Sequence, residues 1–297
     1  MNTKAYIIAG PTASGKSDFA HALATQANGT IINCDSVQIY RGIESISASP
    51  FVSRDNFDEI DGIPYRLFSV LPLAKQISVS EYLEMARREY ESVMGAGRTP
   101  IFVGGTGYYI NALINGISPM PNISDESRTR ARALVASDIV AARALLPADF
   151  VARDPQRVAR ALEVFFETGH HITEFQNMPR VGAVVPNAIR VLVSPDINEL
   201  RHRIANRIPQ MLSSGAMVEA KRIIDTGWDE NRAIGASQLC KLIRGEISES
   251  ECIQDWIIRT NQYAKRQRTW FRTQYLPDII INHTPTLDDV AILLNSI

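Results

Sequence analysis

Short apolar runs bounded by turn residues recur along the chain, and amphipathic patterns separate them. Five runs have the length of buried strands: 5–9, 30–34, 100–104, 188–194 and 278–282. One of the helical patterns between them begins at Ser78-Val79-Ser80-Glu81, a capping box. This alternation predicts an α/β fold with a parallel sheet flanked by helices.

The stretch 122–187 breaks the alternation. It contains several helical patterns and no convincing strand. A chain of 297 residues favours one large domain with a smaller insert over two equal domains. We therefore predict a core made of 1–121 and 188–297, with a small helical subdomain at 122–187.

The first apolar run leads into a phosphate-binding pattern. Gly10 to Ser17 read GPTASGKS, which matches G-x-x-x-x-G-K-[S/T], and a helical pattern follows from about Ser17 to Ala27. In such a loop the backbone N–H groups point inward, the lysine supplies a point charge and the hydroxyl binds Mg²⁺. We predict that the loop binds two or more linked phosphates and that Ser17 is a metal ligand. The predicted loop residues are Gly10, Pro11, Thr12, Ala13, Ser14, Gly15, Lys16 and Ser17.

Polar residues follow two other predicted strands. Strand 100–104 runs into Gly105-Thr106-Gly107 without a carboxylate, which argues against ATP hydrolysis. The run 30–34 ends at Asp35. The carboxyl ends of adjacent parallel strands open on one crevice, so Asp35 and Thr106 should lie beside the phosphate loop. A helix cap for Asp35 and a turn role for Thr106 remain open.

Arginines cluster in three places. Arg157 and Arg160 share one face of a helix that opens at Asp154-Pro155. Arg203 and Arg207 lie one turn apart and can converge on one anion. Between Arg259 and Tyr275, basic and aromatic residues interleave with no acidic one, a pattern suited to phosphate contacts and stacking on unpaired bases. An ordinary amphipathic helix with a basic face is the alternative for this last segment.

Composition narrows the possible classes of protein. The formal charge of −1 gives no overall positive field, so any nucleic-acid surface must come from local clustering. Three widely separated cysteines predict reduced thiols, and the five histidines form no metal pattern. The chain enters a strand at once and has no apolar run of membrane length. We expect a cytoplasmic monomer that contacts no membrane.

Five segments together resemble the tRNA dimethylallyltransferases of bacteria, from the first strand to about residue 275. They are GPTASGKS, Asp35 to Gln38, Val103 to Tyr109, Asp154-Pro155-Gln156-Arg157 running into Arg160 to Val164, and Lys265-Arg266-Gln267 before Trp270. The resemblance implies a prenyltransferase with a P-loop fold that is not a nucleotide hydrolase. It also implies dimethylallyl diphosphate as donor, Mg²⁺ as cofactor, and an adenosine next to the anticodon in the tRNA anticodon stem-loop as acceptor.

The resemblance also implies roles for individual residues. Asp35 would accept the proton of the adenine amine, while Thr106 and Arg207, with Lys16, Ser17 and Mg²⁺, would stabilise the charge on diphosphate. The target base must leave its stack to react. The residues expected to contact tRNA are Asp35, Ser36, Val37, Gln38, Thr106, Arg128, Gln156, Arg157, Val158, Ala159, Arg160, Arg232, Gly235, Lys265, Arg266, Arg268, Trp270 and Arg272.

The chain departs from the family pattern in two places. Members commonly read Gly-Tyr-Arg-Gln where this chain has Gly235-Ala236-Ser237-Gln238, and the stretch between Arg128 and Asp154 is shorter than usual. Two other functions remain open. An adenylate isopentenyltransferase would make a free cytokinin and would need neither the insert nor the basic C-terminal segment. A small-molecule kinase would share the loop but bind ATP.

Overall fold

The structure, a computed structural model, describes residues 4–52, 54 and 56–295. The chain divides into two compact units, one formed by 1–114 and 184–297 and the other by 115–183. The bounds of the second unit differ from the predicted 122–187 because a backbone pair joins its two ends. Ile117 and Val181 exchange two N–H···O bonds of 2.9 Å.

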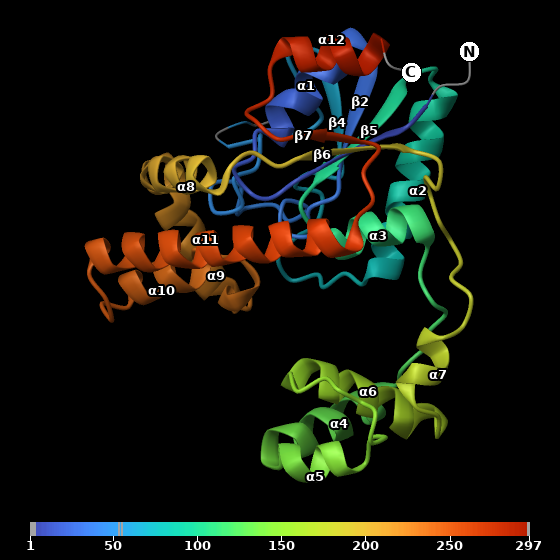
Figure 1. Cartoon of the computed structure of the whole chain (residues 1–297). Coiled ribbons are helices and arrows are strands. Elements are labelled where there is room, and N and C mark those ends of the chain that lie inside the picture. The colour runs from blue at the N-terminus through green and yellow to red at the C-terminus, as the bar shows by residue number, and fades with distance from the viewer. Residues whose placement is uncertain (1–3, 53, 55, 296–297) are drawn as a thin grey trace. The chain divides into compact units, whose positions relative to one another are not determined.

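A seven-stranded sheet forms the centre of the first unit (Figure 1). The strand order is β3-β4-β2-β5-β1-β6-β7, and all neighbours are parallel except β3 and β4. The strands are β1 (Tyr6–Ala9), β2 (Gly29–Asn33), β3 (Glu59–Ile60), β4 (Ile63–Arg66), β5 (Thr99–Gly104), β6 (Ile189–Val193) and β7 (Ile279–Ile281). Because β1 lies between β5 and β6, the loop after β1 emerges at the middle of the sheet.

The sheet is apolar on both faces, as expected for parallel strands covered by helices. Ile8, Ile31 and Ile101 pack on one face with residues of α1 (Lys16–Gln26) and α12 (Leu287–Asn295), which lie together (Figure 1). Neighbouring strand residues such as Ile7 and Phe102 are equally buried and point to the opposite face. This double burial explains why the strands read as continuous apolar runs.

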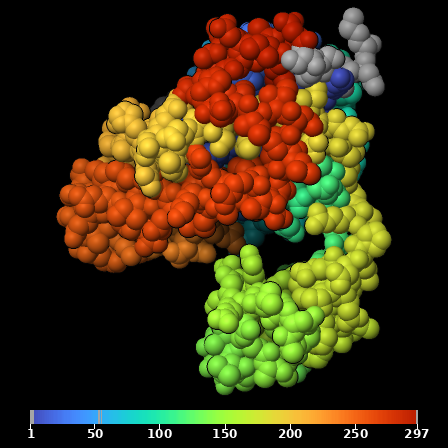
Figure 2. Space-filling model, in the orientation of Figure 1, coloured from blue at the N-terminus to red at the C-terminus, as the bar shows by residue number. Residues whose placement is uncertain are grey.

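The remaining helices of the first unit pack around the sheet and against each other. They are α2 (Val79–Gly95), α3 (Gly107–Asn115), α8 (Ile197–Met211), α9 (Met217–Thr226), α10 (Ala236–Ile243) and α11 (Glu249–Gln274), with a π-helical turn at Leu212–Ala216 and a 3₁₀ turn at Glu230–Arg232. Helix α11 packs against α8 and α10, and α10 packs against α9. Figure 2 shows α10 and α11 as one continuous surface of this unit. No helix in the described part of the chain is long and apolar enough to cross a membrane.

The second unit is wholly helical, apart from the Ile117–Val181 pair. Its helices are α4 (Asp125–Ser137), α5 (Ile139–Ala144), α6 (Pro155–Thr168) and α7 (Ile172–Gln176). Asp154 caps α6 by accepting from Arg157 N–H, and Pro155 occupies the first turn, as predicted. Val158, Leu162 and other apolar residues of α6 form a small core with α4 and α5.

The structure confirms the expected α/β fold with a parallel sheet and flanking helices. The five predicted strands appear within a residue or two of their expected bounds. The short strands β3 and β4 were missed because strands of two and four residues are too short for a clear alternation of apolar and polar positions. Helix α11 begins well before the predicted basic segment, at a capping box formed by Ser248 and Glu251.

A buried carboxylate on α9 fixes the segment that follows β2. Glu219 accepts hydrogen bonds of 2.8 Å from Ser45 N–H and Ile46 N–H, one on each carboxylate oxygen. Burial raises the pKa of Glu219, and the two N–H donors oppose that shift. The Gln38 side chain holds the same segment by donating to Ser47 O and Ala48 O.

Glu219→Gln should lower the free energy of unfolding by about 1–3 kcal/mol, the cost of an unpaired buried polar group. The amide keeps one acceptor for Ser45 or Ile46 but turns an NH₂ group toward the other N–H. Urea unfolding at neutral pH measures the loss. Asp225→Asn, on the exposed side of the same helix, is the matched control and should change the stability by less than about 0.5 kcal/mol. Equal effects in the two variants would contradict this account of Glu219.

Candidate active site

The predicted phosphate loop lies between β1 and α1. Its conformation requires positive φ at Ala13 (63°) and Gly15 (88°). A Cβ at Gly10 would lie 2.3 Å from Val193 O, so only glycine fits beside β6. Helix α1 begins without a side-chain cap, which leaves its first N–H groups for an anion. The Ser14 hydroxyl is buried and has no partner among the described residues.

Two cations face this loop without a carboxylate partner. Lys16 Nζ donates to Pro11 O at 3.2 Å, and Arg207 Nη2 donates to Thr12 Oγ1 at 2.8 Å. Neither makes an ion pair with a described residue, and Arg207 Nε is buried and unbonded. Burial lowers the pKa of both groups; for Lys16, Asp35 opposes the shift and Arg207 adds to it. Desolvated cations left in this way are typical of an anion site.

Arg203 lies one turn from Arg207, as the sequence predicted, but it is engaged differently. Its guanidinium pairs with Glu199 at 3.2 Å and donates to Ala13 O and to Thr284 Oγ1. Arg203 thus supports the phosphate loop at Ala13, whereas Arg207 contacts Thr12 and has a buried Nε without a hydrogen-bond partner among the described residues.

Asp35 lies just past the carboxyl end of β2. The Asn33 side chain holds it on both sides, accepting from Asp35 N–H at 2.8 Å and donating to Asp35 O at 2.9 Å. Asp35 Oδ1 accepts from Val37 N–H at 2.9 Å and so holds a turn. The helix cap that the sequence left open is not formed, because a turn and not a helix follows Asp35. Asp35 Oδ2 accepts no hydrogen bond from the described residues and is therefore the oxygen placed to accept a proton.

Thr106 connects the ends of β5 and β2. Its hydroxyl oxygen accepts from Ser36 N–H at 3.0 Å and lies 3.2 Å from Ser36 Oγ. Thr106 therefore holds the turn that carries Asp35. The structure brings the ends of β1, β2 and β5 to one crevice, as the parallel topology requires.

A cavity of about 720 Å³ opens at this crevice, entirely within the first unit. Thr12 to Asp18, Asp35 to Gln38, Arg203 and Arg207 line its polar side. Apolar side chains line the rest: Ile46, Ile208, Met211, Ile234 and Trp256. A site that combines a phosphate loop with an apolar wall suits a ligand with an anionic head and a hydrocarbon tail.

Oxygen ligands for a divalent cation are present but few. Among the described residues no group of three His, Cys, Asp or Glu side chains could hold a metal alone. Mg²⁺ usually takes only one or two protein oxygens and fills the rest of its shell with water and phosphate. The exposed Ser17 hydroxyl, which lines the cavity, therefore fits an ion that arrives with a diphosphate.

Two predicted tRNA contacts between α9 and α10 differ in exposure. Arg232 is exposed at the rim and lies 3.9 Å from Asp229. Gly235 is buried, and a Cβ there would lie 2.2 Å from the Trp256 ring. Its glycine is explained by this close approach and by a φ of 99°.

Helix α11 presents some of its predicted RNA contacts and uses others internally. Lys265, Arg266 and Arg272 are exposed. Arg268 donates to Pro195 O at 2.5 Å, and the Trp270 ring covers Gly107, where a Cβ would lie 2.5 Å from the ring. Arg268 and Trp270 thus pack within the first unit, which limits their freedom to bind an RNA chain.

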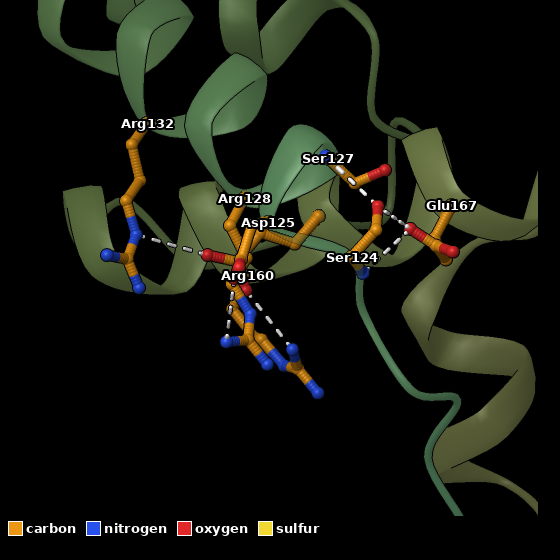
Figure 3. Close-up of polar contacts among 8 residues, drawn as sticks. Ser124, Asp125, Ser127, Arg128, Arg132, Arg160 and Glu167 are labelled. Atoms are coloured by element: carbon orange, nitrogen blue, oxygen red, sulfur yellow. Dashed lines mark hydrogen bonds and ion pairs between the residues drawn. The ribbon is translucent and has the colours of Figure 1, made fainter. Parts of the chain in front are cut away.

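The second unit carries an arginine surface around a buried acid (Figure 3). Glu163, 5% exposed, pairs with Arg132 at 3.3 Å and with Arg160 at 3.1 Å, and Arg128 lies nearby on α4. Among the predicted contacts here, Gln156, Arg157 and Arg128 are exposed and Arg160 is half-buried. Val158 and Ala159 are both buried, and Val158 belongs to the small core of this unit, so their contact with tRNA stays a prediction that their side-chain burial does not favour.

Sequence reasoning missed Gln267 and Tyr263 as parts of the site. Both lie on the face of α11 that lines the cavity, together with Thr260. Positions 260, 263 and 267 are three and four residues apart, so the sequence places these residues on one face of a predicted helix. The basic residues of the same segment gave the stronger signal in the sequence.

A glycine-rich loop between a parallel strand and a helix, with two cations at the adjoining cavity, is the arrangement of proteins with a P-loop-like α/β fold. Comparison with known families is more specific. The family model described as IPP transferase matches residues 38–274, and the one described as isopentenyl transferase matches residues 3–59. The chain belongs to the IPP transferase family.

Named relatives agree with this assignment. The tRNA dimethylallyltransferase of Agrobacterium fabrum is 36% identical over 290 residues, covering 92% of this chain and 95% of its own. The enzyme of the same name from Zymomonas mobilis is 38% identical and covers 90% and 87%. The crystal structure of the full-length tRNA isopentenylpyrophosphate transferase from Bacillus halodurans superposes with a TM-score of 0.70 at 28% identity, covering 99% of this chain and 95% of that one.

Proposed function

We propose that this chain transfers a dimethylallyl group from dimethylallyl diphosphate to the exocyclic amine of an adenosine in tRNA, next to the anticodon. The observation that carries the proposal is the pair of half-buried cations without a carboxylate partner among the described residues, Lys16 and Arg207, at the cavity that Asp35 also lines. The names of relatives that match nearly the whole chain support the same activity. An enzyme acting on tRNA would work in the cytoplasm, and since one chain supplies every residue assigned here, we expect a monomer to suffice.

The phosphate loop would hold the diphosphate of the donor. Negative charge grows on the diphosphate as the allylic C–O bond breaks, and fixed donors in a desolvated site stabilise it best. Lys16, Arg207 and the uncapped N–H groups of α1 are placed for this role. The apolar wall formed by Ile208, Met211 and Trp256 would take the hydrocarbon part.

Asp35 would act as the base. The adenine amine forms a bond to the allylic carbon while the bond from that carbon to the diphosphate oxygen breaks. The amine then loses a proton, which Oδ2 of Asp35 accepts. Because Oδ1 is held by Val37 N–H, the carboxylate stays oriented toward the cavity. Thr106 would serve the reaction by holding Ser36 beside Asp35.

We propose Mg²⁺ as the cofactor, held by the Ser17 hydroxyl and the donor's phosphate oxygens. When bound, the ion supplies positive charge that offsets the diphosphate. The tRNA would contact exposed residues of α11 and the arginines of the second unit, with the target base taken out of its stack.

A product assay tests the proposal. The protein is incubated with dimethylallyl diphosphate, Mg²⁺ and an anticodon stem-loop, and nucleosides are analysed by mass spectrometry for dimethylallyl-adenosine. Two parallel reactions replace the stem-loop with AMP, or the donor with ATP. Equal prenylation of AMP would replace this proposal with an adenylate isopentenyltransferase, and phosphoryl transfer from ATP would replace it with a kinase.

The RNA surface of α11 gives a separate prediction. Replacing Lys265, Arg266 and Arg272 with Ala removes three exposed charges, so the slope of log affinity against log salt should fall by about two to three units for a stem-loop. Arg268 is kept because it binds Pro195 O. Filter binding across a salt series measures the slope, and donor affinity is the internal control. An unchanged slope would make this surface an ordinary solvated helix face.

A further inference from the structure

The phosphate loop is tied to the basic helix by a single buried side chain. Gln267 of α11, 7% exposed, accepts from Thr12 N–H at 2.8 Å through Oε1 and donates to Gly105 O at 2.9 Å through Nε2. Thr12 belongs to the loop after β1, and Gly105 follows β5. One carboxamide therefore bridges the ends of two adjacent strands from a position 255 residues away from Thr12.

The chemistry of this bridge requires a glutamine. One partner is a backbone donor and the other a backbone acceptor, so the orientation of the amide is fixed: a flipped amide would place NH₂ against N–H and oxygen against oxygen. Space is limited as well, because a Cβ at Gly105 would lie 2.4 Å from Nε2. Glycine at position 105 is thus explained by the need to admit this side chain.

The bridge reaches the donor site through Thr12. The Thr12 backbone is held by Gln267, and its hydroxyl accepts from Arg207 Nη2 at 2.8 Å. Arg207 has no ion-pair partner among the described residues, so the Thr12 hydroxyl is the side chain that holds its guanidinium. A Thr12 peptide free to rotate would leave Arg207 without a fixed position.

We infer that Gln267 is a positioning residue of the transfer reaction, which fixes the Thr12 peptide and through it Arg207 at the diphosphate site. The expected kinetic effects rest on the proposed function. Lys265 and Arg266, the two residues before it, are exposed on the outer side of α11. The same helical turn therefore carries the proposed RNA contacts outside and the support of the donor loop inside.

Gln267→Met tests this, since methionine keeps the length and removes both hydrogen bonds. Gln262→Met makes the same change on an exposed position of α11 and is the matched control. The measurements are kcat and KM for the donor with an anticodon stem-loop, the Kd of inorganic pyrophosphate with Mg²⁺ by calorimetry, and the Kd of the stem-loop alone. We expect Gln267→Met to lower kcat by about 10- to 100-fold, the scale for misplaced catalytic groups. Pyrophosphate binding should weaken, while the stem-loop affinity and the control stay at parental values.

A purely structural glutamine would give a different result. It would lower the melting temperature and the fraction of active protein, but kcat per active site and the Kd of pyrophosphate would stay parental, and that outcome overturns the inference. Gly105→Ala displaces the same side chain by an independent route and should reproduce the kinetic effect if Gln267→Met does not fold. Weakened pyrophosphate binding in a protein whose parent modifies no RNA would refute the proposed function and leave the positioning role intact.

Gln267→Glu adds a readout that depends on protonation. The neutral carboxyl can still accept from Thr12 N–H and donate to Gly105 O, whereas the ionised form turns an oxygen toward that carbonyl. The ratio of its kcat to that of the parent should therefore rise as the pH is lowered. Taking the ratio removes the pH dependence that the two proteins share. A ratio independent of pH would contradict the bridge.

Discussion

Replacing Asp35 with Asn should lower kcat by at least ~10²-fold, the usual lower scale for loss of a general base. Asparagine keeps an oxygen that can accept from Val37 N–H, so the turn after β2 should stay in place. It cannot take the proton released by the amine. Single-turnover prenylation of an anticodon stem-loop measures the effect.

The same variant should bind inorganic pyrophosphate nearly as the parent does, because Asp35 contributes no positive charge to the phosphate loop. Asp225→Asn, an exposed change on α9, controls for the altered net charge and should leave kcat unchanged. Turnover of Asp35→Asn within a factor of two of the parent would remove Asp35 from the mechanism.

The parts of the site that the sequence predicted are those encoded by local backbone rules. GPTASGKS specifies its own turn through positive φ at Ala13 and Gly15, and the parallel strands place Asp35 beside it. The strands themselves were readable because burial on both faces requires unbroken apolar runs. Such features can be predicted from neighbouring residues or from the topology of the sheet.

The missed parts depend on contacts between distant segments. Gln267 belongs to a segment that carries the family resemblance, but its position in the sequence gives it no contact with the loop, and only the packing of α11 brings it to Thr12 and Gly105. Glu219 likewise reads as a surface residue of an amphipathic helix until Ser45 and Ile46 are placed against it. The spacing of residues along the sequence does not indicate that these segments come into contact.

Burial also separates residues that the sequence treats alike. Positions 156 to 160 were predicted as a block, yet the helical period of α6 turns Val158 and Ala159 inward and leaves Gln156 and Arg157 outside. On α11 the same period exposes Arg266 and turns Arg268 toward Pro195 O. A contiguous motif on a helix therefore divides into a binding face and a packing face.

Lys16→Met should reduce catalysis and stabilise the unliganded protein at the same time. Removing the ammonium should cost about 10²- to 10³-fold in kcat, the range for loss of one fixed donor at developing charge. The KM for the donor should rise as well, because the ground-state diphosphate also contacts the loop. Lys16 has no ion-pair partner among the described residues, and in the absence of ligand the hydrogen bond to Pro11 O and the charge of Asp35 offset only part of the desolvation cost, because its pKa remains lowered. A methionine of similar length avoids that cost, and the melting temperature without ligand should rise.

The pH dependence of this stability difference follows from the lowered pKa of Lys16. The unfolded chain, whose lysine has the ordinary pKa, binds a proton more tightly than the folded protein does. The free energy of unfolding of the parent should therefore rise with pH between the lowered pKa of Lys16 and its ordinary pKa of 10.5. Lys16→Met has no ammonium at this position and should not show this rise. The difference in melting temperature between Lys16→Met and the parent should therefore become smaller as the pH rises. Added pyrophosphate should reverse the sign of this difference, because it stabilises the parent more. Thermal melts across pH with and without pyrophosphate measure both effects. A variant that melts below the parent without ligand at neutral pH would mean that Lys16 has an unrecognised stabilising role in the empty loop.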